Sequence, residues 1–592
     1  MERKRLLFFA FYLIVLTFSA SGAYLTNFPQ KIIQPDGKVI HCFLSGDEYY
    51  SWLHDENNFT IIQDQKTGVY CYAMIQNGQL LASKYIVGID DPNTAGLRSG
   101  IQISQEAILK LRKQSTLDLP DEPEPEMKNA PINTPRTLNN IVTYVRFSDQ
   151  NEFEPKQATY ASYFNSVETG ANSMYNYFRE VSYQKLHVVS SFYPLNNGTA
   201  IKSYQDSHIR NYYCPWTAQN DSGYSVTDGG IMKNERESEL ITNAIKYIRN
   251  QIPSSLDLDT DKDGKVDNVC FIIRGNPFIP DSACPTILWP HSYKMYDTNV
   301  SLKLKWVYSY NIQLEDYLDN LQTGVLCHEM FHSLGAGDLY RYNGTPVGPW
   351  DIMAEMTNPP QSMCAEYKAR YGKWIDINSI PEIKLSGHYS LNPISSAENN
   401  CYKINSSNPY EYYMLEFRVK SGTFESSLPG TGLIIYRIDK SACCRNLNGP
   451  PDWIYIFRPG DSSSANENIA EAYFDASAGR SIFQNTDYPA CHLNTDSKDN
   501  ISIENILVTG NTVSFDVRFY NVEYSNTDQL PPMTKAINQI KTSGSVVVKN
   551  TDRVLFESGR EILLNEGFEV QTGGQFETII SPMDTCNNSS GK

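Results

Sequence analysis

Residues 325–338 read VLCHEMFHSLGAGD, a stretch with two histidines four positions apart. On a helix, His328 and His332 lie on one face, so both imidazoles can reach a single metal ion. Glu329 lies on the adjacent edge, where its carboxylate can accept a proton from a metal-bound water instead of binding the metal. The opposite side carries apolar residues spaced by four, namely Leu326, Met330 and Leu334. The stretch therefore predicts an amphipathic helix with metal ligands on one side and core on the other.

This helix is expected to end at Gly335, because glycine permits the left-handed conformation that reverses the chain. Asp338 follows three residues later, where a turn can bring its carboxylate back to the two histidines. Two histidines and one carboxylate leave the fourth position of a zinc ion open for water, as catalysis requires. With 9 His in 592 residues, roughly 0.01 accidental HExxH matches are expected, and the later Gly and Asp lower that number further. The pattern predicts a zinc site made by His328, His332 and Asp338, with Glu329 as the catalytic base.

The spacing HExxHxxGxxD resembles the metzincin signature, in which the last ligand is usually histidine. With aspartate in the last place, the chain is more specifically similar to the immune inhibitor A-like family of secreted metallopeptidases. Further segments follow the order usual in that family over most of residues 35–520, namely GDEYYSWL, YCYAM, NYFREVSYQKL, ILWPHSY, YYMLEFR and LPGTGLIIYRID. The resemblance implies a multidomain zinc protease with an α+β metzincin-like catalytic domain, an N-terminal propeptide module and C-terminal all-β domains.

Metzincins have a methionine in a tight turn beneath the metal. Met353, in GPWDIMAEM, lies fifteen residues after Asp338 and is the first choice for this structural Met-turn; Met356 is the second, and either could be core packing. Several metzincins also place a tyrosine two residues after that methionine to steady the tetrahedral intermediate. This chain has Glu355 there, which leaves the oxyanion-stabilising residue unassigned. Three other groups could approach the cleft, although a structural role explains each more simply: Tyr340, Tyr367 and His291.

A second candidate ion site lies in residues 259–267, DTDKDGKVD. Acids at alternating positions can converge on a hard cation while Gly264 makes a sharp bend. An EF-hand has a glutamate at the twelfth position, where this loop has Cys270 within the expected strand NVCFII, so no helix–loop–helix unit is predicted. The alternative is an acidic, solvated turn, but similar loops in the resembled family favour structural calcium. The expected calcium ligands are Asp259, Asp261, Asp263 and Asp267.

The chain begins like an exported protein. Basic residues near the start are followed by an apolar run over residues 6–18 and by small residues up to Ala23, which together predict a secretory signal peptide over residues 1–23. The alternative is a membrane anchor, but this apolar run falls short of the roughly 20 residues that a spanning helix needs. No later stretch is apolar enough to span. The expected location is therefore secreted and extracellular, with no membrane span.

Cysteine content and charge narrow the class further. Twelve cysteines in an exported chain predict disulfide bonds, and the neighbours Cys443 and Cys444 are expected to bond elsewhere rather than to each other. Cys327, next to the first ligand, is expected to be structural, because adjacent helix positions point about 100° apart. The formal charge of -17 and the pI near 5.1 oppose binding to phosphate backbones, so no nucleic acid partner is expected.

At 592 residues the chain is expected to form several domains. Residues 24–114 alternate short β-rich runs with turns, and residues 115–136 form a proline- and acid-rich linker open to proteases. A leading module with a cleavable linker predicts a propeptide; an independent accessory domain is the alternative. Strands and helices in succession indicate an α/β or α+β catalytic domain over residues 137–376. Short β runs predict a β-sandwich over residues 377–520 and a small β-strand stack over residues 521–592, which resembles appendages of secreted bacterial enzymes.

These features predict a secreted zinc metalloendopeptidase that hydrolyses peptide bonds of proteins and is made as a zymogen. Cys42 or Cys71 could block the zinc before activation, since thiolates bind zinc well, but both are equally expected as disulfide partners. One alternative is an exported cell-surface binding protein with a structural zinc site and β modules that contact glycan or protein; the presence of Glu329 argues against it. The other is a zinc hydrolase acting on a non-peptide bond, which only the resemblance opposes.

Overall fold

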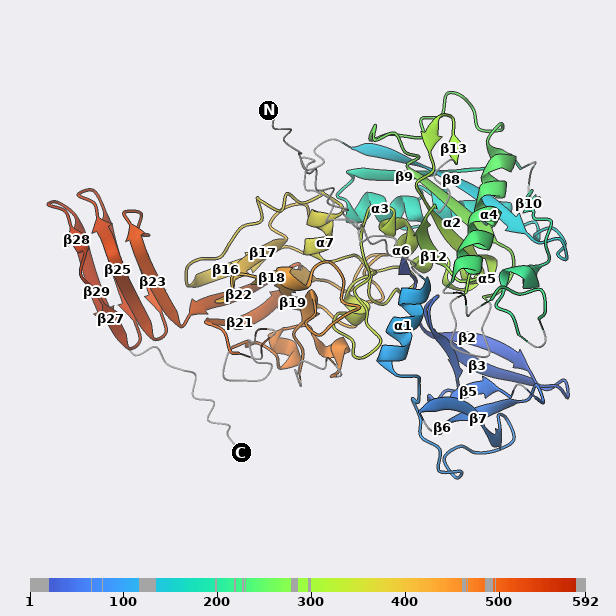
Figure 1. Cartoon of the computed structure of the whole chain (residues 1–592). Helices are drawn as coiled ribbons and strands as arrows, with labels where there is room; N and C mark the ends of the chain where they lie inside the picture. Colours follow the sequence, from blue (N-terminus) through green and yellow to red (C-terminus); the bar gives the residue numbers. More distant parts are fainter. Residues whose placement is uncertain are drawn as a thin grey trace, which may run out of the picture.

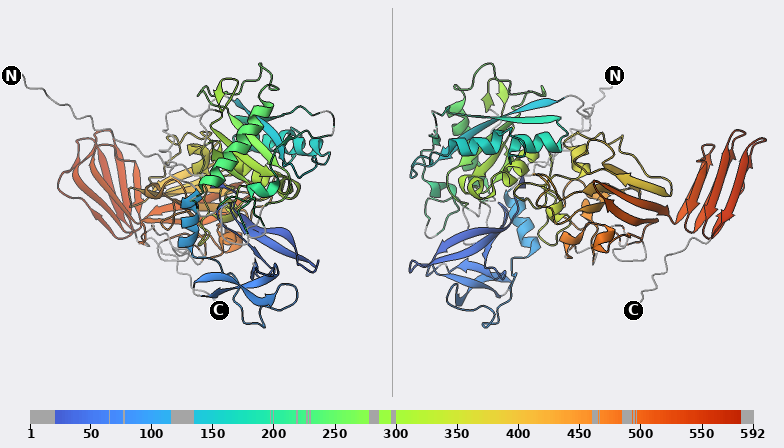
Figure 2. Two further views of the ribbon diagram at one scale, coloured as in Figure 1. Left: turned by 45° about the vertical axis from the view of Figure 1, so that its right-hand side comes forward. Right: turned by 180° about the vertical axis from the view of Figure 1, so that it is seen from behind.

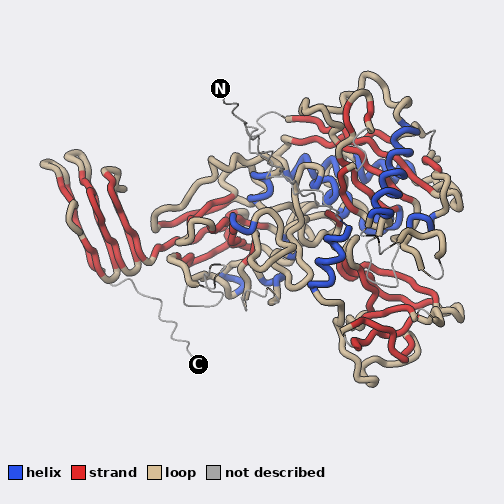
Figure 3. Tube along the Cα trace, in the orientation of Figure 1, coloured by secondary structure: helices blue, strands red, loops and turns tan. Residues whose placement is uncertain are grey.

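The computed structural model describes residues 21–581, apart from residues 65, 77, 116–134, 197, 199, 218–219, 226–227, 229, 278–285, 296–299, 460–464, 466, 485–492, 494 and 496. The prediction of a multidomain chain is confirmed, and strands predominate over helices (Figure 3). The leading module (blue) and the mixed domain (cyan to green) lie together at one end, the sandwich (yellow to orange) follows, and the C-terminal stack (red) forms the other end (Figure 1). Most of the predicted signal peptide and linker lies outside the described residues.

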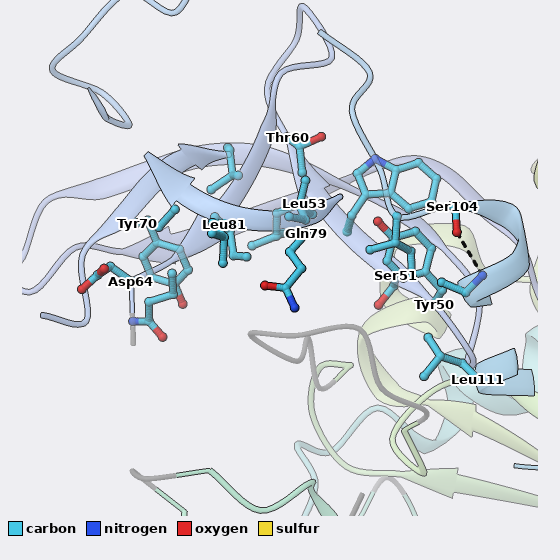
Figure 4. Close-up of a pocket in the computed structure, with 18 of the residues that line it drawn as sticks. Tyr50, Ser51, Leu53, Thr60, Asp64, Tyr70, Gln79, Leu81, Ser104 and Leu111 are labelled. Carbon is cyan, nitrogen blue, oxygen red and sulfur yellow. Dashed lines mark hydrogen bonds between the residues drawn. The ribbon is translucent and has the colours of Figure 1, made fainter. Parts of the chain in front are cut away.

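The leading module is a six-stranded antiparallel sheet followed by one helix. Each strand pairs with the next in the chain, in the order β2 (Leu25–Ile33), β3 (Val39–Gly46), β4 (Ser51–His54), β5 (Thr60–Gln63), β6 (Tyr70–Gln76) and β7 (Gln79–Ile86). Helix α1 (Gln105–Ser115) borders a cavity of about 1030 Å³ that this sheet also lines, with Leu53 and Leu81 on the sheet side and Leu111 on the helix side (Figure 4). None of the residues that line this cavity belongs to the candidate metal centre described below.

The mixed domain is built on a seven-stranded sheet whose central strands run parallel and whose edge is antiparallel. Its order is β1 (Ser21–Gly22), β12 (His291–Lys294), β15 (Ser309–Leu314), β11 (Asn268–Ile273), β8 (Arg136–Arg146) and β10 (Tyr204–Gln205), with β9 (Leu186–Phe192) also paired to β8. A separate ladder joins β13 (Ser301–Leu302) to β14 (Lys305–Trp306). Parallel strands need long crossover connections, and the helices of this domain supply them.

Helices cover both faces of this sheet because its strands are apolar on both sides. Strand β8 sends Val142 and Tyr144 to one core and Ile141 and Val145 to the other, as expected for alternating side chains. The first core includes α2 (Gln157–Asn165), α3 (Met174–Val181), α6 (Gly324–His332) and α7 (Ala365–Arg370), and the second includes α4 (Ile231–Ile248) and part of α5 (Glu315–Leu321). Short 3-10 helices are η1 (Arg210–Tyr213), η2 (Gly348–Trp350), η3 (Lys440–Ala442), η4 (Ile469–Glu471) and η5 (Ala476–Ala478).

Both cores extend across domain boundaries. The core beneath α4 continues into the leading module through buried side chains such as Phe28 and Leu44. The core beneath α6 continues into the next domain through buried side chains such as Tyr436 and Ile438. The mixed domain is therefore packed through apolar contacts on both sides, against the leading module and against the sandwich.

The next domain consists of two antiparallel sheets that share one core. One sheet has the order β16 (Gly387–Leu391), β22 (Thr512–Phe519) and β21 (Ile501–Thr509). The other has the order β17 (Cys401–Asn405), β18 (Glu411–Arg418), β19 (Gly432–Asp439) and β20 (Ile454–Ile456). Leu391 and Val517 from the first sheet and Phe417 from the second are fully buried in the core between them.

The C-terminal module is a stack of parallel strands that projects beyond the sandwich (Figure 2). One side is formed by β23 (Asn521–Thr527), β25 (Gln539–Val548), β27 (Glu561–Leu563) and β28 (Phe568–Val570), and the other by β24 (Met533–Ala536), β26 (Arg553–Ser558) and β29 (Gln575–Ile580). Its small core includes Ile540, Val548 and Phe556. The sandwich lies between this module and the mixed domain (Figure 1).

One expectation about the cysteines was wrong. Cys443 and Cys444 form a disulfide bond with each other. The other cysteines among the described residues are buried and free, so neither neighbour finds a different partner there. Cys327 is fully buried in the core, and burial raises the pKa of its thiol well above the usual value. Within the described ranges, no helix is both long enough and apolar enough to cross a membrane.

Candidate metal centre

The candidate metal centre is built on α6. His328 and His332 lie one turn apart on this helix, and Asp338 returns to them after the chain reverses at Gly335, whose φ of +95° favours glycine. Ligand atoms of the two histidines and Asp338 all lie within 4.8 Å of one another. The three side chains are only 0%, 3% and 2% exposed, respectively. The helical spacing and the glycine turn thus bring together the three residues that the sequence singled out.

The separations among these ligand atoms suit a tetrahedral ion. Nε2 of His328 lies 3.1 Å from Nε2 of His332 and 3.3 Å from Oδ1 of Asp338, and Nε2 of His332 lies 3.4 Å from the same oxygen. Ligands held about 2.0–2.1 Å from a tetrahedral zinc ion are separated from each other by about 3.3 Å. Both carboxylate oxygens of Asp338 are buried without a hydrogen-bond partner among the described residues, a need that a cation would meet.

Backbone carbonyls fix the orientation of both imidazoles. Nδ1 of His328 lies 2.8 Å from the Ile352 carbonyl, and Nδ1 of His332 lies 2.7 Å from the Ala336 carbonyl. A carbonyl oxygen only accepts, so each Nδ1 carries the proton and each Nε2 presents a lone pair toward Asp338. Burial also lowers the pKa of His328, which favours the neutral, metal-binding form. Two lone pairs this close repel unless a cation lies between them.

Glu329 is fully buried beside the ligands but is not one of them. Burial, together with the charges of Glu48 and Asp338, raises the pKa of the Glu329 carboxyl well above its usual value. A dication held by the neighbouring ligands would favour the ionised carboxylate. Glu329 thus lies next to the candidate ligands without being one of them.

A segment of the chain itself occupies the space in front of Glu329. The Ala23 N–H donates to Oε1 of Glu329 at 2.9 Å, and the indole N–H of Trp289 donates to the Ala23 carbonyl at 3.0 Å. Strand β1 runs antiparallel to the edge strand β12, with Gly22 opposite His291. A peptide group therefore lies against the candidate base in an extended conformation. No local pattern in the sequence indicates this contact, because Ala23 and Glu329 are 306 residues apart.

The leading module closes the same region with acidic and aromatic side chains. Tyr24 packs its ring 4.9 Å from the ring of Tyr340, which lies two residues after Asp338. Asp47, on the segment between β3 and β4, accepts hydrogen bonds from the hydroxyls of Tyr340, at 2.9 Å, and Tyr342. Both oxygens of the next residue, Glu48, are buried without hydrogen-bond partners in the described part of the chain. Cys42 and Cys71 lie in β3 and β6 and do not belong to the cluster of metal-ligating side chains.

The segment around Met353 supports the metal centre from below. Met353 is fully buried, whereas Met356 is only partly buried. The Met353 N–H donates to Asp351 at 2.8 Å, and the Met353 carbonyl accepts from the Leu339 N–H at 2.7 Å, which ties this turn to the residue after Asp338. Ile352, in the same turn, supplies the carbonyl that orients His328. These contacts favour Met353 over Met356 as the methionine of the turn.

The turn is also held by an arginine that the sequence did not single out. Arg418, on β18 of the sandwich, is completely buried and donates from Nη1 to the Trp350 carbonyl at 2.6 Å. Its guanidinium contacts the carboxylates of Glu416, at 3.2 Å, and Glu425, at 2.8 Å. A residue of the sandwich thus holds the turn beneath the candidate metal centre. No local pattern in the sequence indicates this role of Arg418, because the contact joins residues that are 68 positions apart.

The acidic loop forms a second group of potential metal ligands. Asp259, Asp261 and Asp263 each place a carboxylate oxygen within 4.8 Å of the others. Asp259 is buried, its Oδ1 lacks a hydrogen-bond partner among the described residues, and its Oδ2 accepts from Lys305 at 2.6 Å. Asp267 lies outside the group, because its two oxygens accept backbone N–H groups of Thr260, at 2.8 Å, and Asn139, at 3.0 Å.

Comparison with known proteins assigns the chain to no family. A scan against protein-family models finds none that matches the chain, and no curated protein matches it. The chemistry assigned to the metal centre therefore rests on the residues that form it.

Proposed function

We propose that this chain is a secreted, zinc-dependent endopeptidase. The observation that carries the proposal is the combination of three convergent ligands with a fourth side chain that contacts a peptide group instead of the metal position. His328, His332 and Asp338 form the ligand set, and Glu329 accepts the N–H of Ala23 at 2.9 Å. A structural zinc site is closed by four protein ligands, whereas a catalytic site keeps a position open. This ligand set therefore favours an enzyme over a binding protein with structural zinc.

A zinc ion held by His328, His332 and Asp338 would supply Lewis acidity toward the scissile carbonyl and the attacking water. Glu329 accepts a proton from the attacking water and later gives it to the leaving amine. The Ala23 N–H donates to Oε1, so Glu329 lies within hydrogen-bond reach of a peptide nitrogen, as transfer of a proton to a leaving amine requires. The Ile352 and Ala336 carbonyls hold the two imidazoles in the metal-binding orientation throughout.

We assign residues 137–376 as an α+β metzincin-like catalytic domain, with Met353 in the turn beneath the ligands. The parallel strands with an antiparallel edge, and the ligand helix directly behind that edge, support this assignment. The similarity of the ligand spacing to the immune inhibitor A-like peptidases supports it as well.

We further propose that the chain is made as a zymogen, with residues 24–114 as the propeptide module. An extended segment paired to β12 and hydrogen-bonded to Glu329 excludes a substrate from the same place. Its ladder runs antiparallel to the edge strand, an arrangement by which extended peptides bind sheet edges. The predicted linker around residues 116–134 would be the point of cleavage. We also propose export after removal of a signal peptide. Its cleavage would have to precede Ser21 rather than follow Ala23, because residues Ser21 to Ala23 must stay attached to pair with β12 and to contact Glu329.

The test is hydrolysis of unfolded casein by the full-length chain before and after proteolytic cutting in residues 115–136. We expect the intact chain to be latent and the cut chain to hydrolyse casein. A zinc chelator should abolish the activity of the cut chain progressively, and added zinc should restore it, because the ligands must hold the ion for the water to be activated. Hydrolysis that survives removal of zinc, as verified by metal analysis, would disprove the zinc mechanism. Equal activity of intact and cut chains would disprove latency.

We also propose that the acidic loop binds a structural calcium ion through Asp259, Asp261 and Asp263. Calcium prefers carboxylate oxygens, and the buried, unpartnered Oδ1 of Asp259 is available to it. Asp267 would then shape the loop through its bonds to backbone N–H groups rather than bind the ion.

Calcium at a hundredfold excess over its Kd is expected to stabilise the folded domain by about 2.7 kcal/mol, and so to raise its Tm. Asp259→Asn should abolish this calcium-dependent rise, because it weakens the buried ligand. The matched control is Asp257→Asn, which changes an exposed carboxylate paired with Lys262 outside the cluster and should leave the rise intact. Differential scanning calorimetry with calcium or with a calcium chelator measures both. If the Tm of the wild type does not change with calcium, the proposed calcium site is wrong.

A further inference from the structure

Peptide hydrolysis at the proposed site needs a group that no residue has yet supplied. Attack of water on the scissile carbonyl places negative charge on its oxygen, and a positioned hydrogen-bond donor stabilises that charge. The residue two places after Met353 is Glu355, which stands where several metzincins have a tyrosine hydroxyl. A donor must therefore come from elsewhere in the cleft. Three side chains were candidates on sequence grounds, and their surroundings distinguish them.

Two of these candidates are engaged by partners within their own domain. The hydroxyl of Tyr367 donates to the Gly337 carbonyl at 2.9 Å, and its ring is fully buried. His291 has Nδ1 2.7 Å from the Trp289 carbonyl and Nε2 2.7 Å from Oε1 of Glu237, so both ring nitrogens already face acceptors. Removing the leading module leaves these contacts unchanged. Tyr367 and His291 thus hold the ligand loop and the edge strand in place.

Tyr340 differs because its acceptor lies in the leading module. Its hydroxyl donates to Oδ2 of Asp47 at 2.9 Å, and its side chain is 5% exposed beneath that module. Its ring centroid lies 4.9 Å from that of Tyr24, in the segment that occupies the cleft. Tyr340 therefore presents a hydroxyl donor two residues after a metal ligand, and its ring contacts the segment that occupies the cleft.

We propose that Tyr340 is the catalytic residue whose hydroxyl donates a hydrogen bond to the oxyanion of the tetrahedral intermediate. In the zymogen, Asp47 accepts the hydrogen bond of this hydroxyl and so keeps it from a substrate. The phenol proton stays on Tyr340 throughout, since the hydroxyl stabilises charge and transfers no proton. When the leading module departs, Asp47 leaves with it and the hydroxyl becomes available to a substrate carbonyl. This inference rests on the proposed endopeptidase function and names a further residue of the same site.

Tyr342 provides a matched control on the same loop. Its hydroxyl also donates to Oδ2 of Asp47, so removing it perturbs the zymogen contact in a similar way. Its ring lies farther from Tyr24, at 6.3 Å, and it is four residues beyond the ligand Asp338. Tyr342→Phe therefore tests the loss of a hydroxyl at this interface without the proposed catalytic contact.

The experiment compares the full chain, cut in the linker after purification, as wild type, Tyr340→Phe and Tyr342→Phe. Tyr340→Phe is expected to lower kcat for a peptide substrate by about 10²-fold, the effect of losing one oxyanion donor, with KM and zinc content nearly unchanged. Tyr342→Phe should stay close to wild type. A phosphinic peptide, whose anionic oxygens mimic the tetrahedral intermediate, should bind Tyr340→Phe more weakly by the same factor as kcat/KM falls. If Tyr340 had only a structural role, the loss of phosphinic peptide affinity would not match the loss of kcat/KM.

The outcomes separate this inference from the proposed function. If wild type hydrolyses the peptide and Tyr340→Phe retains a kcat within about threefold of it, the assignment of Tyr340 is overturned and the endopeptidase proposal stands. A loss of kcat without a matching loss of phosphinic peptide affinity also overturns the assignment. If the zinc-loaded wild type hydrolyses no peptide after cutting, the endopeptidase proposal fails and Tyr340 loses its role with it.

Discussion

Replacing Glu329 with glutamine in the activated chain is expected to lower kcat/KM for a peptide substrate by about 10³-fold while zinc stays bound. Glutamine has the same shape as glutamate, and its carbonyl oxygen can still accept the N–H that Glu329 accepts from Ala23. It cannot take a proton from water at neutral pH, so the water is no longer activated. Because Glu329 lies outside the ligand set, metal analysis should show wild-type zinc content.

The control for this change is Glu355→Gln, which removes a carboxylate from the same part of the molecule. Burial raises the pKa of Glu355, and its charge acts on Tyr24 in the cleft. Since Glu355 contacts neither a ligand nor the Ala23 amide, this variant should keep most of its activity. A Glu329→Gln enzyme with full zinc and a kcat/KM within tenfold of wild type would contradict the role of Glu329 as the base.

The second large effect is expected from Arg418→Met. This change leaves Glu416 and Glu425 buried next to an apolar side chain, and an uncompensated buried charge costs about 3–5 kcal/mol of folding free energy. It also releases the Trp350 carbonyl, two residues before the carbonyl that orients His328. Since partners behind the ligands typically contribute about 10–100-fold to metal affinity, zinc binding should weaken by that factor. Urea unfolding and competition with a zinc chelator measure the two effects.

Arg437→Met distinguishes a specific effect from general destabilisation. Arg437 is buried on the neighbouring strand β19 and is paired with Glu411 instead of with the carboxylates beside the Met353 turn. Its replacement should lower the urea midpoint yet leave zinc affinity close to wild type. If both arginine variants bind zinc as tightly as wild type does, the sandwich does not support the metal centre.

The parts of the site that could be predicted from the sequence are those encoded by local geometry. The four-residue spacing of His328 and His332 defines one face of a helix, and Gly335 allows the reversal that returns Asp338 to them. Each of these relations spans only a few residues, so a pattern in the sequence can represent it. The alternation of strands and helices in the mixed domain could be anticipated for the same reason.

The rest depends on contacts between distant segments, which leave no periodic signal. Ala23 meets Glu329 across 306 residues, and Arg418 meets Trp350 across 68. A buried arginine or a small residue near a leader has an ordinary explanation when it is read alone. The pairing of Cys443 with Cys444 was mispredicted, because disulfides usually join positions that are separated in the sequence. Asp267 fits the spacing of a calcium loop, but its oxygens are taken by backbone N–H groups.

The core shared between the leading module and the mixed domain would affect the lifetime of the protein after the proposed maturation. Phe28 and Leu44 lie in the same apolar core as the side chains beneath α4, so cutting the linker and losing the module uncovers part of that core. After the proposed cleavage, the folded chain would bury less apolar surface than the intact chain does. Its persistence outside the cell would depend on a slow rate of unfolding rather than on a large equilibrium free energy. A chain that unfolds after this cleavage would lack the leading module against which it first folded.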